Sequence, residues 1–425
     1  MIDLKLFRQD PEGTRTALER RGDEAVSGAL ADLLETDRRW RGLVAETERL
    51  KAERNAQSEE VARRKRSREP AEALLEELKA SGDRVKGLEG ATRELEQQLH
   101  DALLRIPNLP HAAAPTGGAD ANRTVRAWGE PAPAAGGRPH WDIGDALRLF
   151  DLPRGAKLSG SGFPVFTGQG ARLVRALAGF MLDLHTREHG YLEIAPPHLV
   201  TRSSLTGTGQ LPKFEDDLYH TPADDLFLIP TAEVPVTNLY RDEILDAAAL
   251  PARFVAFTPC FRREAGAHGK DTRGLLRVHQ FDKVELVRLC RPEDSDAEHE
   301  LLTGHAETVL RRLELVYRVV ELATGDTGFS AARTYDLEVW APGVGTWLEC
   351  SSSSTFTDFQ ARRANIRFRR EAGAKPEFVH TLSASGVAFA RTIAALLETH
   401  QQADGSVRVP DALAPYLGTD RLAAG

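Results

Sequence analysis

The chain has 425 residues, a formal net charge of −8 and 28% charged residues. A chain of this length is longer than one that usually folds around a single hydrophobic core, so we expect two domains. The mildly acidic net charge excludes a protein that binds polyanions over its whole surface. The three cysteines are scattered, without a CxxC pair, which argues against a disulfide framework and against a zinc site. No apolar stretch approaches the roughly 20 residues that cross a bilayer. We therefore expect a soluble, cytoplasmic chain with no membrane partner.

Residues 33–102 are rich in Glu, Arg, Leu and Ala, a composition typical of long helices. The second half of this stretch has two series at seven-residue steps, which are Leu78, Val85, Thr92, Leu99 and Ser81, Leu88, Leu95, Ala102. A similar series in the first half starts at Leu33 and fades at Arg54. This spacing predicts a coiled-coil seam between about 30 and 102, inside an N-terminal domain of residues 1–105.

A basic run before Pro70 separates the two halves. Proline starts a helix well and continues one badly, so we predict an antiparallel hairpin with a basic turn at its far end. With roughly 30 residues in each helix, the hairpin would be about 45 Å long. On the residues alone, such a hairpin is more typical of a coiled coil that binds protein. The basic side chains are Arg63, Arg64, Lys65, Arg66 and Arg68.

Residues 106–140 are rich in proline, glycine and small residues, so continuous regular structure is not expected there. We place the domain boundary in this linker. Beyond it, in residues 141–425, helical stretches such as 170–189 alternate with short apolar runs such as 254–257 and 335–339. The spacing favours an antiparallel sheet, and the fold class that we predict is α+β.

Three polar clusters in the second domain suit nucleotide chemistry. Residues 261–274 form a basic, glycine-bearing segment between two apolar runs, and arginine forks with close backbone N–H groups suit a triphosphate. Glu349 and Ser352 offer hard oxygen ligands that suit Mg²⁺. Residues 385–391 are mostly small and precede a helix expected at 392–400, so Arg391 would lie at the start of this helix. The plainer alternatives are a solvated charged hairpin, a serine-rich turn and tight helix packing.

The order of these clusters resembles the three motifs of class II aminoacyl-tRNA synthetases, and the segments between them resemble the seryl-tRNA synthetase family. The similarity runs from Met1 almost to the end of the chain. It implies a helical arm followed by a catalytic domain with a mixed, mainly antiparallel sheet flanked by helices. The segments are HLV at 198–200, LPKFE at 211–215, LIPTAEVP at 228–235, TPCFR at 258–262, HQFDKVE at 279–285, TDFQARR at 357–363 and QQADGSVRVP at 401–410.

The resemblance also implies an activity and a set of site residues. ATP and L-serine would form seryl-adenylate with Mg²⁺ as cofactor, and serine would then pass to the 3′-terminal ribose of serine tRNA. The catalytic residues would be Arg262, Glu264 and Arg391. The serine-binding residues would be Thr231, Ala232, Glu233, Arg262, Glu285, Ser383 and Ser385. The ATP-binding residues would be Arg262, Arg263, Glu264, Val278, Phe281, Glu349, Cys350, Ser351, Ser352 and Arg391, with Glu349 and Ser352 on the metal.

Individual roles follow from the same resemblance. Arg262 would bridge the serine carboxylate and the α-phosphate, Phe281 would stack on the base, and Glu285 would read the substrate hydroxyl. Residues 190–197 resemble motif 1, which implies a homodimer. The five basic residues of the hairpin turn would contact the long variable arm of serine tRNA across that dimer. Charging of selenocysteine tRNA is left open.

Two departures from the family pattern lie close to the expected serine site. Residues 383–391 read SASGVAFAR where bacterial members usually have NGSGLAVGR, so Ser383 replaces an asparagine. Residues 350–356 also differ. Neutral drift and a specialised paralogue with a retuned serine pocket are both compatible with these changes. The complete set of site residues argues against a decayed, non-catalytic module, and the complete arm argues against an enzyme that loads a carrier protein.

Overall fold

The computed structural model describes residues 1–133, 137–265 and 273–424, which fall into two compact units. One unit contains residues 3–19 and 23–107. The other contains residues 1–2, 20–22 and the chain from residue 108 onwards. Within the described ranges, no helix combines the length and the apolar composition that a membrane span requires.

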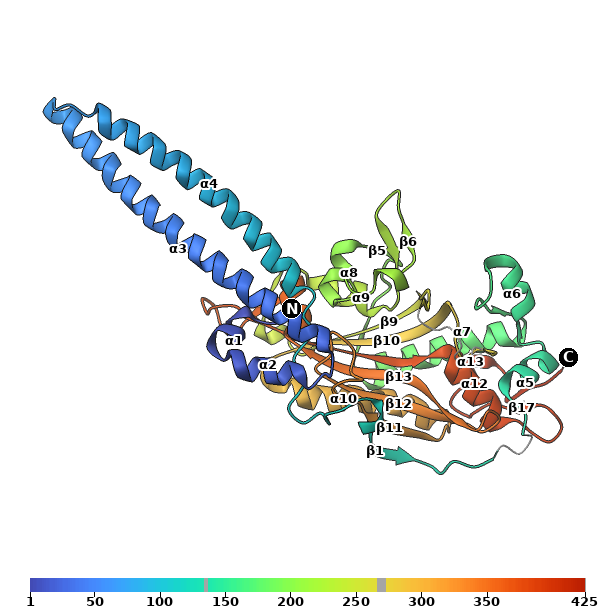
Figure 1. The fold of residues 1–425 in the computed structure, drawn as a ribbon. Helices are drawn as coiled ribbons and strands as arrows, with labels where there is room; N and C mark the ends of the chain where they lie inside the picture. Colours follow the sequence, from blue (N-terminus) through green and yellow to red (C-terminus); the bar gives the residue numbers. More distant parts are fainter. Residues whose placement is uncertain (134–136, 266–272, 425) are drawn as a thin grey trace. The chain divides into compact units, whose positions relative to one another are not determined.

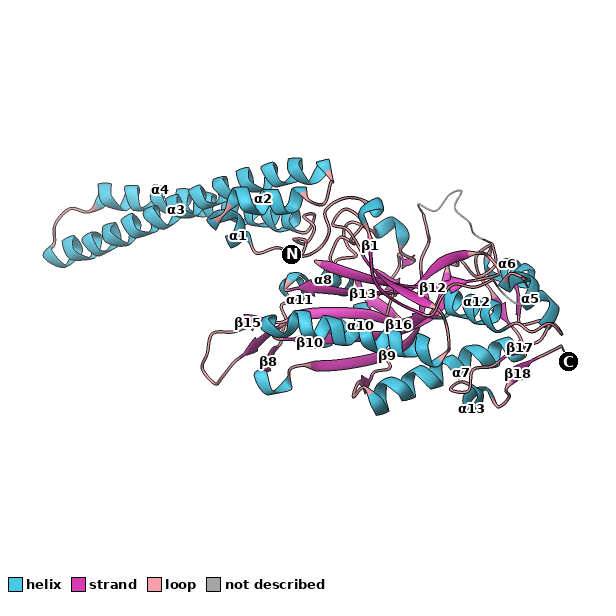
Figure 2. Cartoon of the chain, turned by 90° about the horizontal axis from the view of Figure 1, so that it is seen from below, coloured by secondary structure: helices cyan, strands magenta, loops and turns pink. Residues whose placement is uncertain are grey.

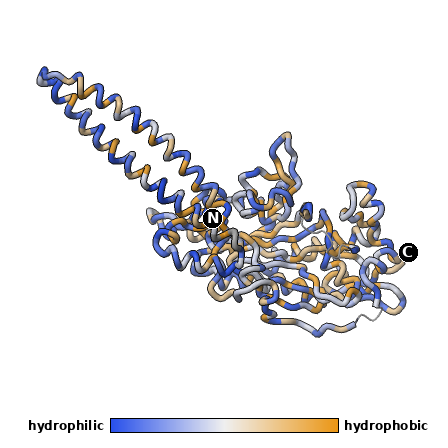
Figure 3. The backbone as a smooth tube through the Cα atoms, in the orientation of Figure 1, coloured by the Kyte–Doolittle hydropathy of each residue, from blue (hydrophilic) through white to orange (hydrophobic). Residues whose placement is uncertain are grey.

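The first unit is a long helical hairpin preceded by two short helices, α1 (Leu4–Gln9) and α2 (Pro11–Glu19). Its two long helices, α3 (Glu24–Ser67) and α4 (Glu72–Leu103), run side by side, and apolar residues recur along both of them (Figures 1 and 3). The predicted seam is confirmed in α4, where Val85, Leu95 and Leu99 are buried.

The hairpin differs from the prediction in length and in the extent of its seam. Helix α3 has 44 residues and α4 has 32, against the roughly 30 expected for each, because α3 begins at Glu24. The seam in α3 also continues beyond Arg54 to the buried Val61. Gln57 is half-buried in this interval, since a long side chain covers a seam with its aliphatic part.

The second unit is built on an eight-stranded sheet with the order β1-β11-β12-β13-β16-β10-β9-β4. All neighbouring pairs are antiparallel except β4 with β9, which confirms a mixed, mainly antiparallel sheet. The bounds are β1 (Arg123–Trp128), β4 (Leu192–Glu193), β9 (Ala252–Phe261), β10 (Gln280–Cys290), β11 (Tyr317–Glu321), β12 (Arg333–Ala341), β13 (Thr346–Thr357) and β16 (His380–Ala388).

Side chains alternate along each strand, so one face of the sheet packs against the main core. The other face is polar along the cavity and apolar where Phe254 and Val287 join a second buried cluster. Leu337, Leu382 and Leu286 point to the main core with the helices α7 (Gln169–Asp183), α10 (Ser295–Arg312) and α12 (Phe389–His400) (Figure 2). The neighbouring residues Asp336, Ser383 and Glu285 instead line a cavity. The period of two therefore separates the residues of the core from those of the site.

One local expectation was wrong. Strand β1 lies inside the Pro- and Gly-rich stretch where no continuous regular structure was expected, and the β-branched Thr124 and Val125 suit the strand that pairs with β11. The helix expected at 392–400 is present and begins three residues earlier, at Phe389, so Arg391 lies in its first turn. The small residues from Ser385 to Ala388 that precede it form the end of β16.

Candidate active site

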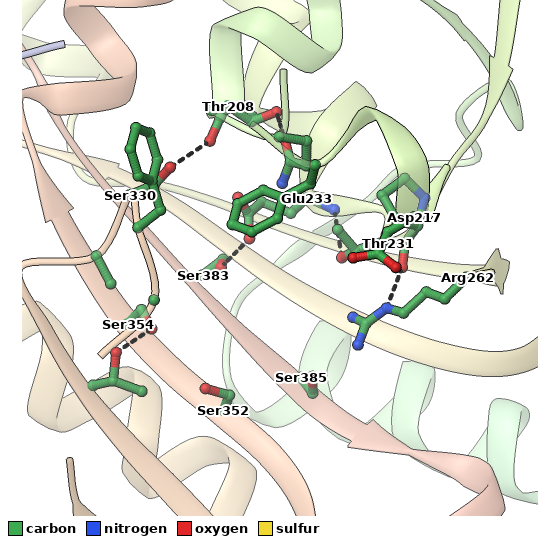
Figure 4. A pocket seen from close by; sticks show the side chains of 18 of the residues that line it. Thr208, Asp217, Thr231, Glu233, Arg262, Ser330, Ser352, Ser354, Ser383 and Ser385 are labelled. Carbon is green, nitrogen blue, oxygen red and sulfur yellow. Dashed lines mark hydrogen bonds between the residues drawn. The ribbon is translucent and has the colours of Figure 1, made fainter. Parts of the chain in front are cut away.

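A cavity of about 770 Å³ lies on the polar face of the sheet. Strands β10, β12, β13 and β16 supply its floor, and the segment around α9 (Glu233–Thr237) supplies a wall (Figure 4). The cavity brings together nine of the predicted site residues from segments that are up to 154 positions apart in the chain. They are Thr231, Glu233, Arg262, Glu264, Glu285, Glu349, Ser352, Ser383 and Ser385.

Glu233 is held at the cavity wall by two donors. Gln360 Nε2 donates to its Oε1 at 2.7 Å. Ser383 Oγ donates to its Oε2 at 2.7 Å (Figure 4). Burial, together with the nearby Glu285 carboxylate, raises the pKa of Glu233. A buried carboxylate with this geometry suits a cationic group such as an α-ammonium, which would restore the ionised form.

Glu285 and Lys283 form a buried ion pair on β10. The two side chains lie two residues apart in one strand, so they point to the same face. Thr231 joins them, because its hydroxyl lies 2.8 Å from Lys283 Nζ and 3.2 Å from Glu285 Oε2. Lys283 is not among the predicted site residues, although strand alternation from Glu285 would have placed it in the cavity.

A second, smaller cavity of about 80 Å³ adjoins the first. Arg262, Glu264 and Ser385 line both cavities, as do Lys283 and Glu349. The second cavity adds Val278, Phe281, Cys350 and Arg391 from the predicted set. Its lining also includes Leu275, Leu276 and Arg277 at the C-terminal end of the loop between β9 and β10.

Arg262 lies where the two cavities meet. Its guanidinium stacks over Phe281 with 5.3 Å between Cζ and the ring centroid, and its Nε donates to the Pro230 carbonyl at 3.4 Å. Opposite, Arg391 Nη1 donates to the Glu349 carbonyl at 2.8 Å, and its Nε donates to the Leu276 carbonyl at 3.2 Å. Two arginines thus face one channel, an arrangement that suits a phosphate chain.

The loop between β9 and β10 is anchored at its start by Asp217. The Arg263 N–H donates to the Asp217 carbonyl at 2.9 Å, and the Ala265 N–H donates to Asp217 Oδ1 at 2.9 Å. Glu264 forms an ion pair with Arg277 across the loop. Residues 266–272, the glycine-bearing part of the predicted phosphate loop, lie outside the described residues.

Three predicted site residues do not line either cavity. Ala232 is fully buried in a small apolar cluster beneath α9. Ser351 is buried and donates its Oγ to the Ser385 carbonyl at 2.6 Å, while Arg263 is exposed. Ser351 points away from the channel because side chains alternate along β13 and Ser352 faces it. A β-bulge at Cys350 lets Glu349, three residues before Ser352, face the channel as well.

Asp336 is a cavity residue that the sequence interpretation missed. It faces Ser352 across the β12–β13 pair, and its buried Oδ1 has no hydrogen-bond partner among the residues that the structure describes. Burial and the Glu349 carboxylate raise the pKa of Asp336 well above its ordinary value. A carboxylate among the apolar residues of β12 was the available signal, since buried charges need a partner. With Glu349 and Ser352, it supplies oxygen atoms of the kind that Mg²⁺ prefers.

The basic residues of the predicted RNA contact lie at the end of α3. Arg63 and Arg64 both form ion pairs with Glu60, at 2.7 and 2.8 Å, so one acidic side chain offsets part of their charge. Arg64 is partly exposed, and the other four basic residues are exposed: Arg63, Lys65, Arg66 and Arg68.

Comparisons with known proteins assign both parts of the chain to synthetase families. Residues 1–110 match the seryl-tRNA synthetase N-terminal domain, and residues 213–400 match the tRNA synthetase class II core domain of the G, H, P, S and T enzymes. The serine–tRNA ligase of Gemmatimonas aurantiaca is 58% identical over all of both chains. That of Geobacter sulfurreducens is 54% identical over 98% of this chain and 99% of the relative. The chain belongs to the seryl-tRNA synthetase family.

A solved structure extends the similarity to the whole fold of this synthetase. The seryl-tRNA synthetase of Pyrococcus horikoshii, complexed with ATP, matches with a TM-score of 0.95 and 38% identity over all of both chains. The comparisons give no support to a specialised paralogue. Ser383 instead lines the larger cavity, where its hydroxyl donates to Glu233.

Proposed function

We propose that this synthetase activates L-serine with ATP, releasing pyrophosphate, and then transfers serine to the 3′ end of serine tRNA. The position of Arg262 carries the proposal, because it lines both the cavity that contains Glu285 and the cavity that contains Phe281 and Arg391. An amino acid in the first and a nucleotide in the second would meet at its guanidinium. The Pyrococcus relative, solved with ATP, supports a nucleotide in this fold.

The first step needs positioning and charge neutralisation more than a side-chain nucleophile. The serine carboxylate oxygen attacks the α-phosphorus in line, the bond to the β-phosphate oxygen breaks, and pyrophosphate leaves. Arg262 would orient the carboxylate against the α-phosphate, and Arg391 would neutralise the outer phosphates. Phe281 would hold the base beside Arg262.

Glu349, Ser352 and Asp336 would hold Mg²⁺. The unpartnered Oδ1 of Asp336 fits this assignment, because a cation would compensate the charge of this buried carboxylate. When bound, the ion would neutralise negative charge that develops on the phosphates. The backbone carbonyl of Glu349 also accepts a hydrogen bond from Arg391. Strand β13 would therefore position both the metal ion and the Arg391 guanidinium.

Serine selection would depend on the buried polar group Thr231, Lys283 and Glu285. A pocket that hydrogen-bonds the substrate hydroxyl rejects alanine, because alanine leaves those polar atoms buried and unpaired, at a cost of up to about 10⁴ in rate. Glu233 would receive the α-ammonium, with Gln360 and Ser383 fixing its orientation.

For the second substrate, we propose that residues 1–105 form a tRNA arm, that residues 106–140 connect it, and that residues 141–425 form the catalytic domain. The exposed basic tip suits phosphate contacts that recognise RNA by shape. We further propose a homodimer formed through residues 190–197, in which the arm reaches tRNA bound to the partner, and a cytoplasmic location.

Charging of RNA tests the proposal directly. The purified chain, incubated with ATP, Mg²⁺ and radiolabelled serine, should load serine tRNA to near-stoichiometric levels. A tRNA without a long variable arm should remain uncharged. The absence of serine transfer to serine tRNA by a preparation that still binds ATP would overturn the assigned function.

A further inference from the structure

A histidine and a glutamate outside the two cavities are both fully buried and bonded to each other. His140 is the first residue of α5 (His140–Leu147), and Glu398 lies in α12, seven residues after Arg391. His140 Nδ1 lies 2.7 Å from Glu398 Oε1, and the His140 backbone N–H donates to the same oxygen at 2.9 Å. We call these two residues the buried dyad.

The other ring nitrogen of His140 contacts the wall of the smaller cavity. The Leu275 N–H donates to His140 Nε2 at 3.0 Å. A backbone N–H can only donate, so Nε2 is the unprotonated acceptor, and Nδ1 carries the hydrogen that it donates to Glu398. Gly274 allows this approach, because it has a φ of +67° and a Cβ there would lie 2.4 Å from Nε2.

Leu275 begins the part of the loop that lines the smaller cavity. The residues from Leu275 to Val278 all face it, and the Leu276 carbonyl accepts a hydrogen bond from Arg391. One short segment is therefore tied to α12 twice, through the backbone of Leu276 to Arg391 and through His140 to Glu398.

The second oxygen of Glu398 holds another segment of the site. The N–H groups of Gly343 and Val344 donate to Oε2 at 2.8 and 3.1 Å. These residues form the turn between β12 and β13, the two strands that carry Asp336 and Glu349. Four donors satisfy this carboxylate, as a buried charge requires.

We propose that the buried dyad positions the nucleotide cavity. His140 and Glu398 are positioning residues that fix the loop end at Leu275 and the β12–β13 turn to the helix of Arg391, so that ATP meets a preformed wall. This inference rests on the proposed function, since it takes the smaller cavity as the nucleotide site. Neither residue touches the cavity itself, so the effect on ATP is transmitted through the Leu275 N–H.

Two substitutions of His140 separate its two hydrogen bonds. In His140→Asn the amide replaces Nδ1, so the donor to Glu398 is kept and the acceptor for Leu275 is lost. In His140→Gln the amide oxygen replaces Nε2, so the acceptor for Leu275 is kept and the donor is lost. We expect His140→Asn to raise the KM for ATP about tenfold and His140→Gln to raise it about twofold or less, with the KM for serine unchanged in both.

A matched control comes from α12, the helix that carries Glu398. His400 is also buried and contacts a backbone carbonyl, that of Leu313, at 3.0 Å, but neither residue lines either of the two cavities. His400→Asn should lower thermal stability and leave the KM for ATP unchanged. If His140→Asn and His140→Gln change the KM for ATP equally, or if neither changes it, the positioning role is overturned.

A measurement on the unaltered protein keeps the test independent of how the variants fold. Without nucleotide, amide hydrogen exchange at Leu275 should already be slow, because its N–H is bonded to His140. Fast exchange at this amide in the nucleotide-free protein would overturn the proposal. Serine-dependent ATP–pyrophosphate exchange by the unaltered protein, recorded alongside, shows whether the proposed function itself holds.

Discussion

At the scale of single residues, the charge pair of Lys283 and Glu285 has a structural role and a proposed role in selectivity. Each side chain is buried, so each needs the other, and both line the larger cavity, where we propose that serine binds. A variant of either residue therefore affects stability and activity together. A second change in the same pair can separate the two effects.

We predict that Glu285→Gln lowers kcat/KM for serine by two orders of magnitude or more, roughly 3 kcal/mol, with little change in the KM for ATP. Lys283 would then be buried without a counter-charge, so the melting temperature should fall as well. The double variant Lys283→Met, Glu285→Gln should regain stability and stay inactive. Recovery of activity in the double variant would show that Glu285 is only a structural partner. Steady-state exchange kinetics and thermal melts provide both readouts.

Ser383 allows a second prediction at this scale. Its hydroxyl donates to Glu233, so Ser383→Ala should lower kcat/KM for serine about tenfold through the loss of one bond of roughly 1 to 3 kcal/mol to a buried carboxylate. Ser383→Asn should retain most of the activity, because its amide also donates. Ser295→Ala removes another buried hydroxyl, bonded to Thr355, and serves as the control. Equal activity of Ser383→Ala and the unaltered protein would remove Ser383 from the serine site.

At the scale of elements, a cluster of histidines joins the end of α7 to α10. The rings of His189 and His305 stack at 3.9 Å, and His185 Nδ1 lies 3.0 Å from His189 Nδ1. Arg288 and Tyr191 also face His305, at 2.8 and 3.2 Å. Burial and the positive neighbours His189 and Arg288 lower the pKa of His305 to about 3, and burial lowers that of His185 far below the ordinary value.

This cluster predicts acid sensitivity. A histidine whose pKa is lower in the folded state takes up protons more readily in the unfolded chain, so the folded state loses stability as the pH falls below about 6.5. Its contribution is fully present at neutral pH. We expect the melting temperature of His305→Phe, which keeps the stacking and removes the titration, to fall less between pH 7 and pH 5 than that of the unaltered protein. If the melting temperatures of both proteins fall equally between pH 7 and pH 5, the histidine cluster is not the origin of the acid sensitivity.

The elements also show which features the sequence could predict. The heptad seam depends on local periodicity, so Val85 was placed correctly on the buried face of α4, whereas the expectation for Glu285 came from the family resemblance. Strand β1 was missed because its partner β11 lies about 190 residues away, and pairing at that distance leaves little local signal. Asp336 was missed because it becomes a candidate metal ligand only through its proximity to Ser352 and Glu349 on the neighbouring strand. His140 and Leu275 likewise meet only through tertiary packing.

At the scale of the whole molecule, the arm and the catalytic domain should separate functionally. Removing residues 35–100, with a short glycine link, should leave formation of seryl-adenylate nearly intact and abolish charging of serine tRNA, because the phosphate contacts of the arm are lost. Replacing Arg63, Arg64, Lys65, Arg66 and Arg68 by alanine should weaken tRNA binding and flatten its dependence on salt. Charging by the armless protein at the normal rate would contradict the role of the arm.

The central claim, that the two cavities join serine to ATP, is tested most directly by ATP–pyrophosphate exchange with serine, alanine, glycine and threonine. The geometry at Arg262 and Glu285 predicts exchange that depends on serine, with alanine and glycine slower by several orders of magnitude and threonine excluded by its methyl group. Exchange driven equally well by alanine, or no exchange with serine, would contradict the assignment of these cavities.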